Sequence, residues 1–228
     1  MEKRPYYEAY DDRYRQVHRE NLEWFTRTPS PIVEQTIREF QIGPNSRILE
    51  LGCGEGRDAI HLLRQGYRVL ATDISPEAIA HCRRIAPTFS NHFQVLDCID
   101  GKLDGQFDFI YAVAVVHMLV EDTHRKGFYQ FIRNHLNASG IALICTMGDG
   151  EAQRKSDITN AFSLQERIHE QSGKTVHIAS TSCRMVDFPT FQRELEENGL
   201  HTLSQGITAI EPDFTEMMYA VVERCALG

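Results

Sequence analysis

The chain has 228 residues, of which 42% are hydrophobic and 25% charged, and these proportions are typical of a globular protein. Its 24 Lys and Arg against 32 Asp and Glu give a net charge of −8, which argues against nucleic acid as a partner. The sequence has no apolar run near the roughly 20 residues that cross a bilayer, no secretion signal and no Cys-x-x-Cys pair. We therefore expect a reduced, cytoplasmic protein without a membrane segment, a disulfide framework or a metal site.

Residues 1–28 are rich in aromatic and charged side chains. Tyr7, Tyr10 and Tyr14 recur at a spacing that places them on one face of a helix. Such a face can be ordinary core packing, or it can cover a ligand, because a buried tyrosine hydroxyl needs a partner and aromatic rings stabilise cations. Trp24 leaves the same two interpretations open. After this segment, Ser30 and Pro31 are typical of a helix start.

Between residues 47 and 147, short apolar strands alternate with helical stretches. This alternation predicts a doubly wound α/β fold with a mainly parallel sheet. The two last strands bring the expected number of strands to seven and close the sheet with an antiparallel pair. The expected strands are 47–49, 67–72, 93–96, 106–112, 141–145, 202–210 and 217–223, and the expected helices are 58–65, 75–85, 124–135 and 189–198.

A Gly-x-Gly-x-Gly loop follows the first of these strands, in the segment Glu50-Leu51-Gly52-Cys53-Gly54-Glu55-Gly56. Asp73 ends the next strand about twenty residues later, where a carboxylate can accept hydrogen bonds from both hydroxyls of a ribose. The carboxylates of Glu50 and Glu55 would repel the pyrophosphate of a dinucleotide. They suit S-adenosylmethionine, which carries a sulfonium and an ammonium group and no phosphate.

Residues 48–56 with Asp73 resemble motif I and the second-strand acid of the class I S-adenosylmethionine-dependent methyltransferases. The resemblance covers about residues 30–148: Asp97 resembles the acid that contacts the adenine amino group, and residues 136–145 resemble the turn into the fifth strand, without its proline and one glycine. Among subfamilies, the chain is most similar to small-molecule types such as the tellurite-resistance and thiopurine methyltransferases. The segments that carry this likeness are 54–58, 65–67 and 113–119.

The resemblance implies S-adenosylmethionine as the cofactor and no metal. The residues expected to bind it are Glu50, Gly52, Cys53, Gly54, Gly56, Asp73, Ile74, Asp97, Cys98 and Val113. Those expected to face the substrate are Tyr10, Tyr14, Trp24, His117, Met118 and Arg184.

His117 is the candidate catalytic residue, because it follows the fourth strand and its ordinary pKa of about 6.5 suits a general base. A pocket wall and a buried core position remain alternatives for it. Arg184 can clamp a substrate carboxylate or form a surface ion pair. Asp108 is expected to have a structural role. His18, His169 and His177 have no metal-ligand spacing and are expected at the surface.

We expect a single methyltransferase domain over residues 1–228. It would comprise a helical lid (1–28), a cofactor-binding core (29–148), a substrate-side insertion (149–185) and a C-terminal helix with a strand pair (186–228). The expected activity is methyl transfer to a small-molecule acceptor. An RNA or protein methyltransferase and a non-catalytic cofactor-binding protein remain alternatives, and the loop disfavours a nicotinamide dehydrogenase. The oligomeric state is left open.

Overall fold

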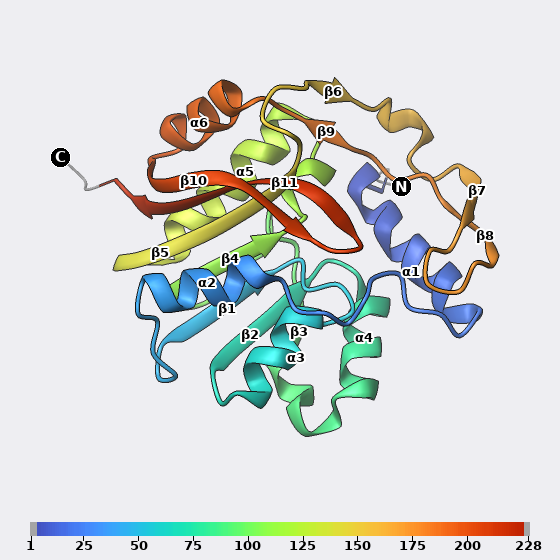
Figure 1. Ribbon diagram of the computed structural model, residues 1–228, viewed down its shortest axis with the longest axis horizontal. Helices are drawn as coiled ribbons and strands as arrows, with labels where there is room; N and C mark the ends of the chain where they lie inside the picture. The colour runs from blue at the N-terminus through green and yellow to red at the C-terminus, as the bar shows by residue number, and fades with distance from the viewer. Residues whose placement is uncertain (1–3, 226–228) are drawn as a thin grey trace.

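A seven-stranded sheet forms the centre of the computed structural model, which describes residues 4–225 (Figure 1). Its strand order is β10-β11-β5-β4-β1-β2-β3, and β11 runs antiparallel to both of its neighbours. The other pairs are parallel, so the expected fold class is confirmed. The strands are β1 (Arg47–Leu51), β2 (Arg68–Asp73), β3 (Phe93–Val95), β4 (Phe107–Val113), β5 (Leu136–Met147), β10 (Leu200–Ile210) and β11 (Phe214–Arg224).

Helices cover both faces of the sheet. Alternate strand residues belong to two different core clusters, because successive side chains of a strand point to opposite faces. Ile48 and Phe109 pack with α2 (Pro31–Glu39), α3 (Arg57–Arg64) and α4 (Pro76–Ile85). Leu49 and Ile110 pack with α5 (Asp122–His135) and α6 (Phe188–Glu197). No helix within residues 4–225 has both the length and the apolar character of a membrane span.

The N-terminal segment folds as η1 (Tyr6–Glu8) and α1 (Ala9–Arg19). Helix α1 packs against α4 and against β8 (Thr175–Ala179), at the edge where the parallel strands end (Figure 1). Asp11 fixes this contact, because its Oδ1 accepts hydrogen bonds from the Ser75 hydroxyl at 2.6 Å and from the Glu77 amide at 3.2 Å. The helix that the tyrosine spacing predicted is therefore tied to the start of α4.

The segment between β5 and α6 is made of short strands and turns. Strand β7 (Leu164–Ile168) pairs with β8, and β6 (Arg154–Lys155) pairs with β9 (Arg184–Met185). The remaining short elements are the 3-10 helices η2 (Pro87–His92), η3 (Val116–Met118) and η4 (Ile158–Asn160).

Asp58 joins the start of α2 to the start of α3. Ser30 precedes α2 with Pro31 as the first helical residue, as expected, but its hydroxyl does not cap that helix. It donates instead to Asp58 at 2.7 Å, and the Ser30 amide donates to the same carboxylate at 2.6 Å. Arg57 in turn pairs with Asp58 and, at 3.1 Å, with Asp213 between β10 and β11.

We expect Asp58→Ala to lower the free energy of unfolding by about 3 kcal/mol, because it leaves buried donors of Ser30 and Arg57 without their carboxylate. Urea unfolding followed by circular dichroism measures this loss. Asp157→Ala is the matched control, since Asp157 also accepts a backbone amide, from Thr159, but on the exposed surface. We expect that variant to lose no more than about 1 kcal/mol. Equal losses in the two variants would contradict the role of Asp58.

Candidate functional site

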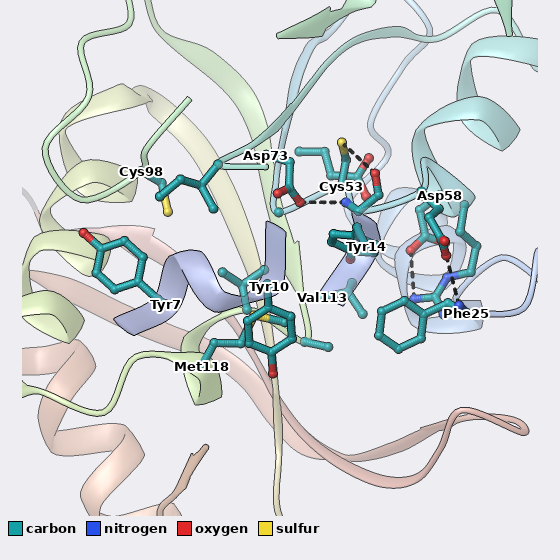
Figure 2. A pocket seen from close by; sticks show the side chains of 18 of the residues that line it. Tyr7, Tyr10, Tyr14, Phe25, Cys53, Asp58, Asp73, Cys98, Val113 and Met118 are labelled. Carbon is teal, nitrogen blue, oxygen red and sulfur yellow. Dashed lines mark hydrogen bonds and ion pairs between the residues drawn. The ribbon is translucent and has the colours of Figure 1, made fainter. Parts of the chain in front are cut away.

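A cavity lies beneath α1 at the carboxyl ends of β1, β2 and β4 (Figure 2). Nearly all of the residues that the sequence assigned to the cofactor come together in it. These are Glu50, Gly52, Cys53, Gly54, Asp73, Ile74, Asp97, Cys98 and Val113. We call it the first cavity.

The glycine loop follows β1 with left-handed backbone at alternate residues. Gly54 has a φ of +53°, and a Cβ there would lie 2.6 Å from the Tyr14 hydroxyl, so the loop backbone and α1 approach closely. Gly56 does not line the first cavity, although the sequence analysis assigned it to the cofactor. Its α-carbon faces Cys82 of α4, and a Cβ would lie 2.9 Å from that sulfur, so this glycine serves helix packing and not the cavity.

Asp73 links the glycine loop to the start of α4. Its Oδ2 accepts the Gly54 amide at 2.8 Å, drawn as a dashed line in Figure 2, and its Oδ1 accepts the Ser75 amide at 2.8 Å. Burial raises the pKa of Asp73 to about 6, although these two hydrogen bonds act in the opposite direction. Each carboxylate oxygen keeps a further lone pair, so Asp73 can accept two more hydrogen bonds from a ligand in the cavity.

Glu50 is the least satisfied group in this cavity. Its side chain is buried, and its Oε2 has no hydrogen-bond partner within the described residues. Burial, followed by the nearby charge of Asp58, raises the pKa of Glu50 well above its usual value. A buried carboxylate in this state is stabilised by a cation. With Asp73 beside it, the cavity therefore suits a ligand that carries hydroxyl groups and positive charge.

Asp97 follows β3 at the opposite end of the first cavity. Its Oδ1 accepts the Ile99 amide at 2.8 Å, and its Oδ2 accepts the Tyr7 hydroxyl at 3.2 Å. Tyr7 and Cys98 lie on the same side of the cavity in Figure 2. The N-terminal tyrosines thus contribute directly to this cavity, and Tyr14 and Tyr10 line it as well.

A second cavity adjoins the first, and the two share Tyr10, Phe25, Met118 and Phe214. It contains four of the residues expected to face the substrate, Tyr10, Trp24, His117 and Met118. Its other walls come from α1, the end of β5, the end of β7 with the turn that follows it, and the turn between β10 and β11. The lining residues from these segments are Arg13, Met147, Arg167, Ile168, His169, Glu170, Gln171 and Asp213.

His117 is only 3% exposed, and its Nδ1 has no partner in the described part of the chain. Burial, and then the positive charges of Arg125 and Arg13, lower the pKa of His117 to about 3. The imidazole is therefore neutral and a weak base in this state. This favours the pocket-wall interpretation of His117, with a ring nitrogen available for a hydrogen bond.

Arg184 lies away from both cavities, which corrects its assignment to the substrate. Its guanidinium donates to the Val120 carbonyl at 2.9 Å and pairs with Asp122 and Glu194, so its charge is already compensated. The surface ion pair is the alternative that the structure contains. Asp108 has the expected structural role, since it accepts the Arg47 amide at 2.7 Å and the Asn137 amide group.

Two histidines that the sequence placed at the surface are buried. His18 lies between Glu55, at 2.9 Å, and Glu77, at 2.8 Å; burial lowers its pKa, but these hydrogen bonds raise it overall. His169 contacts the Glu23 carbonyl at 2.6 Å. Glu55 also accepts the amides of Trp24 and Phe25, so this loop carboxylate holds the N-terminal segment in place.

Several residues that line the two cavities were not predicted from the sequence. Arg13 had a usable signal, because it follows Tyr10 by three residues and so shares its helical face. Phe25 and Phe214 had none, since their rings reach the cavities from segments far apart in the chain. Phe214 begins β11, and its ring lies 5.8 Å from that of Phe25.

Comparison with known proteins identifies the core. Residues 48–140 match the family model described as a methyltransferase domain. The match covers less than half of the chain, and it includes the glycine loop, Asp73 and Asp97, so this part of the chain is similar to a methyltransferase domain. The fold is similar to that of the 1,6-didemethyltoxoflavin-N1-methyltransferase of Burkholderia thailandensis. The superposition covers 96% of this chain and 89% of that protein, with a TM-score of 0.69 at 15% sequence identity.

Two curated methyltransferases are similar in sequence. The malonyl-[acyl-carrier protein] O-methyltransferase of Magnetococcus marinus is 28% identical over 49% of the chain and 42% of its own length. The magnesium-protoporphyrin O-methyltransferase of Rhodobacter capsulatus is 39% identical over 29% of the chain and 31% of its own length. The matched stretches thus span less than half of each relative.

We expect Gly54→Ala to destabilise the protein more than Gly66→Ala. Both glycines have positive φ, but a Cβ at Gly66 meets nothing within 4 Å, whereas one at Gly54 meets the Tyr14 hydroxyl. Backbone strain of about 1–2 kcal/mol applies to both variants, and the steric clash adds to it only at Gly54. Urea unfolding measures the difference, and Tyr14→Phe combined with Gly54→Ala should recover the additional loss. No recovery would contradict the close contact of α1 with the loop.

His117 should make stability sensitive to acid. The unfolded chain binds a proton at His117 more readily than the folded chain, whose pKa there is about 3, so stability is lost as pH falls below about 6.5. Between about pH 6.5 and 4, we expect a steeper loss for the wild type than for His117→Gln, by up to about 1.4 kcal/mol per pH unit. Urea unfolding across this pH range, with the exposed His177→Gln as the control, measures the slopes. Parallel curves would show that the buried imidazole is not held neutral.

Proposed function

We propose that the protein is an enzyme that transfers a methyl group from S-adenosylmethionine to a small-molecule acceptor. The observation that carries the proposal is the buried Glu50 carboxylate, which lines the first cavity beside Asp73 and the glycine loop and whose Oε2 has no hydrogen-bond partner among residues 4–225. This arrangement suits a ligand with a positively charged end and a ribose. The family of the core points to the same cofactor.

Each part of the first cavity has a proposed role. Asp73 would accept hydrogen bonds from the ribose hydroxyls, and Glu50 would stabilise the positively charged methionine end. Asp97, with Cys98, would hold the adenine side. When bound, S-adenosylmethionine supplies an activated methyl group. The protein would contribute alignment and the exclusion of water, for which a cavity closed by α1 is well suited.

The second cavity supports a small-molecule acceptor. It adjoins the first cavity through Tyr10 and Met118, and α1 and the β7–β8 hairpin bound it. The relatives agree in part, because the toxoflavin enzyme is solved with its small-molecule substrate. An RNA or protein methyltransferase is less favoured, since the chain carries a net charge of −8 and the acceptor side lies under a packed helix.

Calorimetric titration with S-adenosylhomocysteine tests the cofactor site. We expect Asp73→Ala to weaken binding by about 10- to 100-fold, because two hydrogen bonds to a charged group are lost. Asp108→Asn is the matched control, a carboxylate at the start of β4 whose loss should leave the affinity unchanged. Equal affinities of the wild type and Asp73→Ala would refute the assignment.

The pH dependence of the same titration provides an independent check. Only the carboxylate form of Asp73 would accept both ribose hydroxyls, and burial raises the pKa of Asp73 to about 6. Wild-type affinity should therefore rise as pH increases through about 6, and this step should be absent in Asp73→Ala. A step of equal size in both proteins would assign the titration to another group, such as Glu50.

Catalysis itself requires an acceptor. Purified protein, donor with a labelled methyl group, and a cell extract separated into small-molecule, RNA and protein fractions would identify the labelled product. We expect label in the small-molecule fraction. Label in RNA or protein would favour that alternative, and cofactor binding without transfer to any fraction would favour a non-catalytic protein.

A further inference from the structure

Arg13 is a buried charge that pairs with no carboxylate in the described part of the chain. The side chain is on α1 and the residue is 8% exposed. Its Nη2 donates to the carbonyls of Ala179 at 2.9 Å and Ser180 at 3.0 Å and to the Thr181 hydroxyl at 2.7 Å, and its Nε donates to Ala179. All of these acceptors are neutral. Buried arginines are normally paired, because an uncompensated buried charge is costly.

The surroundings hold this guanidinium in one position. It lies 5.1 Å from the ring centroid of Tyr10 and 4.8 Å from that of Trp24, which are cation–π distances. Thr181 has a φ of +60°, an unusual backbone conformation for a β-branched residue, and its hydroxyl accepts from Arg13. Nη1 donates to no acceptor within residues 4–225, so two N–H groups remain for a ligand.

The other charged groups of the second cavity do not neutralise Arg13. Burial lowers the pKa of Arg13, and the positive charge of the nearby Arg167 lowers it further. Asp213 is already bound to Arg57 and Thr26, and Glu170 is exposed. His117 adds a neutral imidazole with an unpartnered nitrogen. The buried charge of the second cavity is therefore the cation Arg13, whereas the buried charges of the first include the carboxylates Glu50 and Asp73.

We propose that the methyl acceptor carries a carboxylate, which Arg13 binds in the second cavity, and a flat apolar body that packs against the aromatic and methionine walls. These walls include Trp24, Phe25, Met118 and Phe214. Because Met118 and Phe25 also line the first cavity, an acceptor held in this way lies beside the cofactor site. The inference rests on the proposed function, and it adds the chemical class of the acceptor.

Paired acids and amides test this class. The protein is saturated with S-adenosylhomocysteine, and ligand-observed NMR titrations compare benzoate with benzamide, cinnamate with cinnamamide, and indole-3-acetate with indole-3-acetamide. We expect at least one acid to bind about tenfold more tightly than its own amide, because only the acid brings a negative charge to the Arg13 guanidinium and can form an ion pair with it. Arg13→Met should abolish this preference.

Arg167→Ala keeps the test decisive if Arg13→Met fails to fold. Arg167 is exposed, and its removal should weaken the acid about threefold while leaving the amide unchanged. Arg38→Ala, an exposed arginine on α2, is the matched control and should change neither. Equal binding of acids and amides, or no binding of any acid, would overturn the carboxylate subsite. If S-adenosylhomocysteine binds in that experiment while the acids do not, the cofactor site of the proposed function stands and only the carboxylate subsite fails; if S-adenosylhomocysteine does not bind, both proposals fail.

Discussion

The carboxylate of Asp73 joins the parts of the protein that form the first cavity. One oxygen holds the glycine loop through the Gly54 amide, and the other holds the start of α4 through the Ser75 amide. The Ser75 hydroxyl continues this chain of contacts to Asp11 of α1. A single buried acid thus positions the loop, the helix that follows β2 and the helix that covers the site. Its raised pKa is the consequence of this burial.

The buried side chains of the two adjoining cavities differ in the sign of their charge. The first contains Glu50 and Asp73, both with pKa values raised by burial, and the second contains Arg13, which binds only neutral acceptors among residues 4–225. A cationic donor and an anionic acceptor would each be bound by the cavity of opposite charge. The same arrangement would disfavour exchange of the two ligands between the cavities, since like charges would then meet in a buried space.

The N-terminal segment supplies walls to both cavities. Tyr14 lies against Gly54, Tyr10 lines both cavities, and Arg13 lies in the second. Glu55 anchors the segment by accepting the amides of Trp24 and Phe25 and by contacting His18. The glycine loop therefore has two roles: its backbone faces the first cavity, and one of its side chains holds the cover of that cavity in place.

The sequence by itself determined the sheet, the glycine loop and Asp73, because these depend on local pattern. Strand and helix periods are local, and a loop after one strand lies beside the end of the neighbouring parallel strand in any doubly wound sheet. Only the tertiary structure decided that Arg184 is neutralised by Asp122 and Glu194, that Gly56 packs against Cys82, and that His18 is buried between two glutamates. These outcomes depend on which distant segments meet. The same is true of Arg13, which binds only neutral acceptors among residues 4–225. The lack of a carboxylate beside it can be recognised only when all neighbours of the side chain are known.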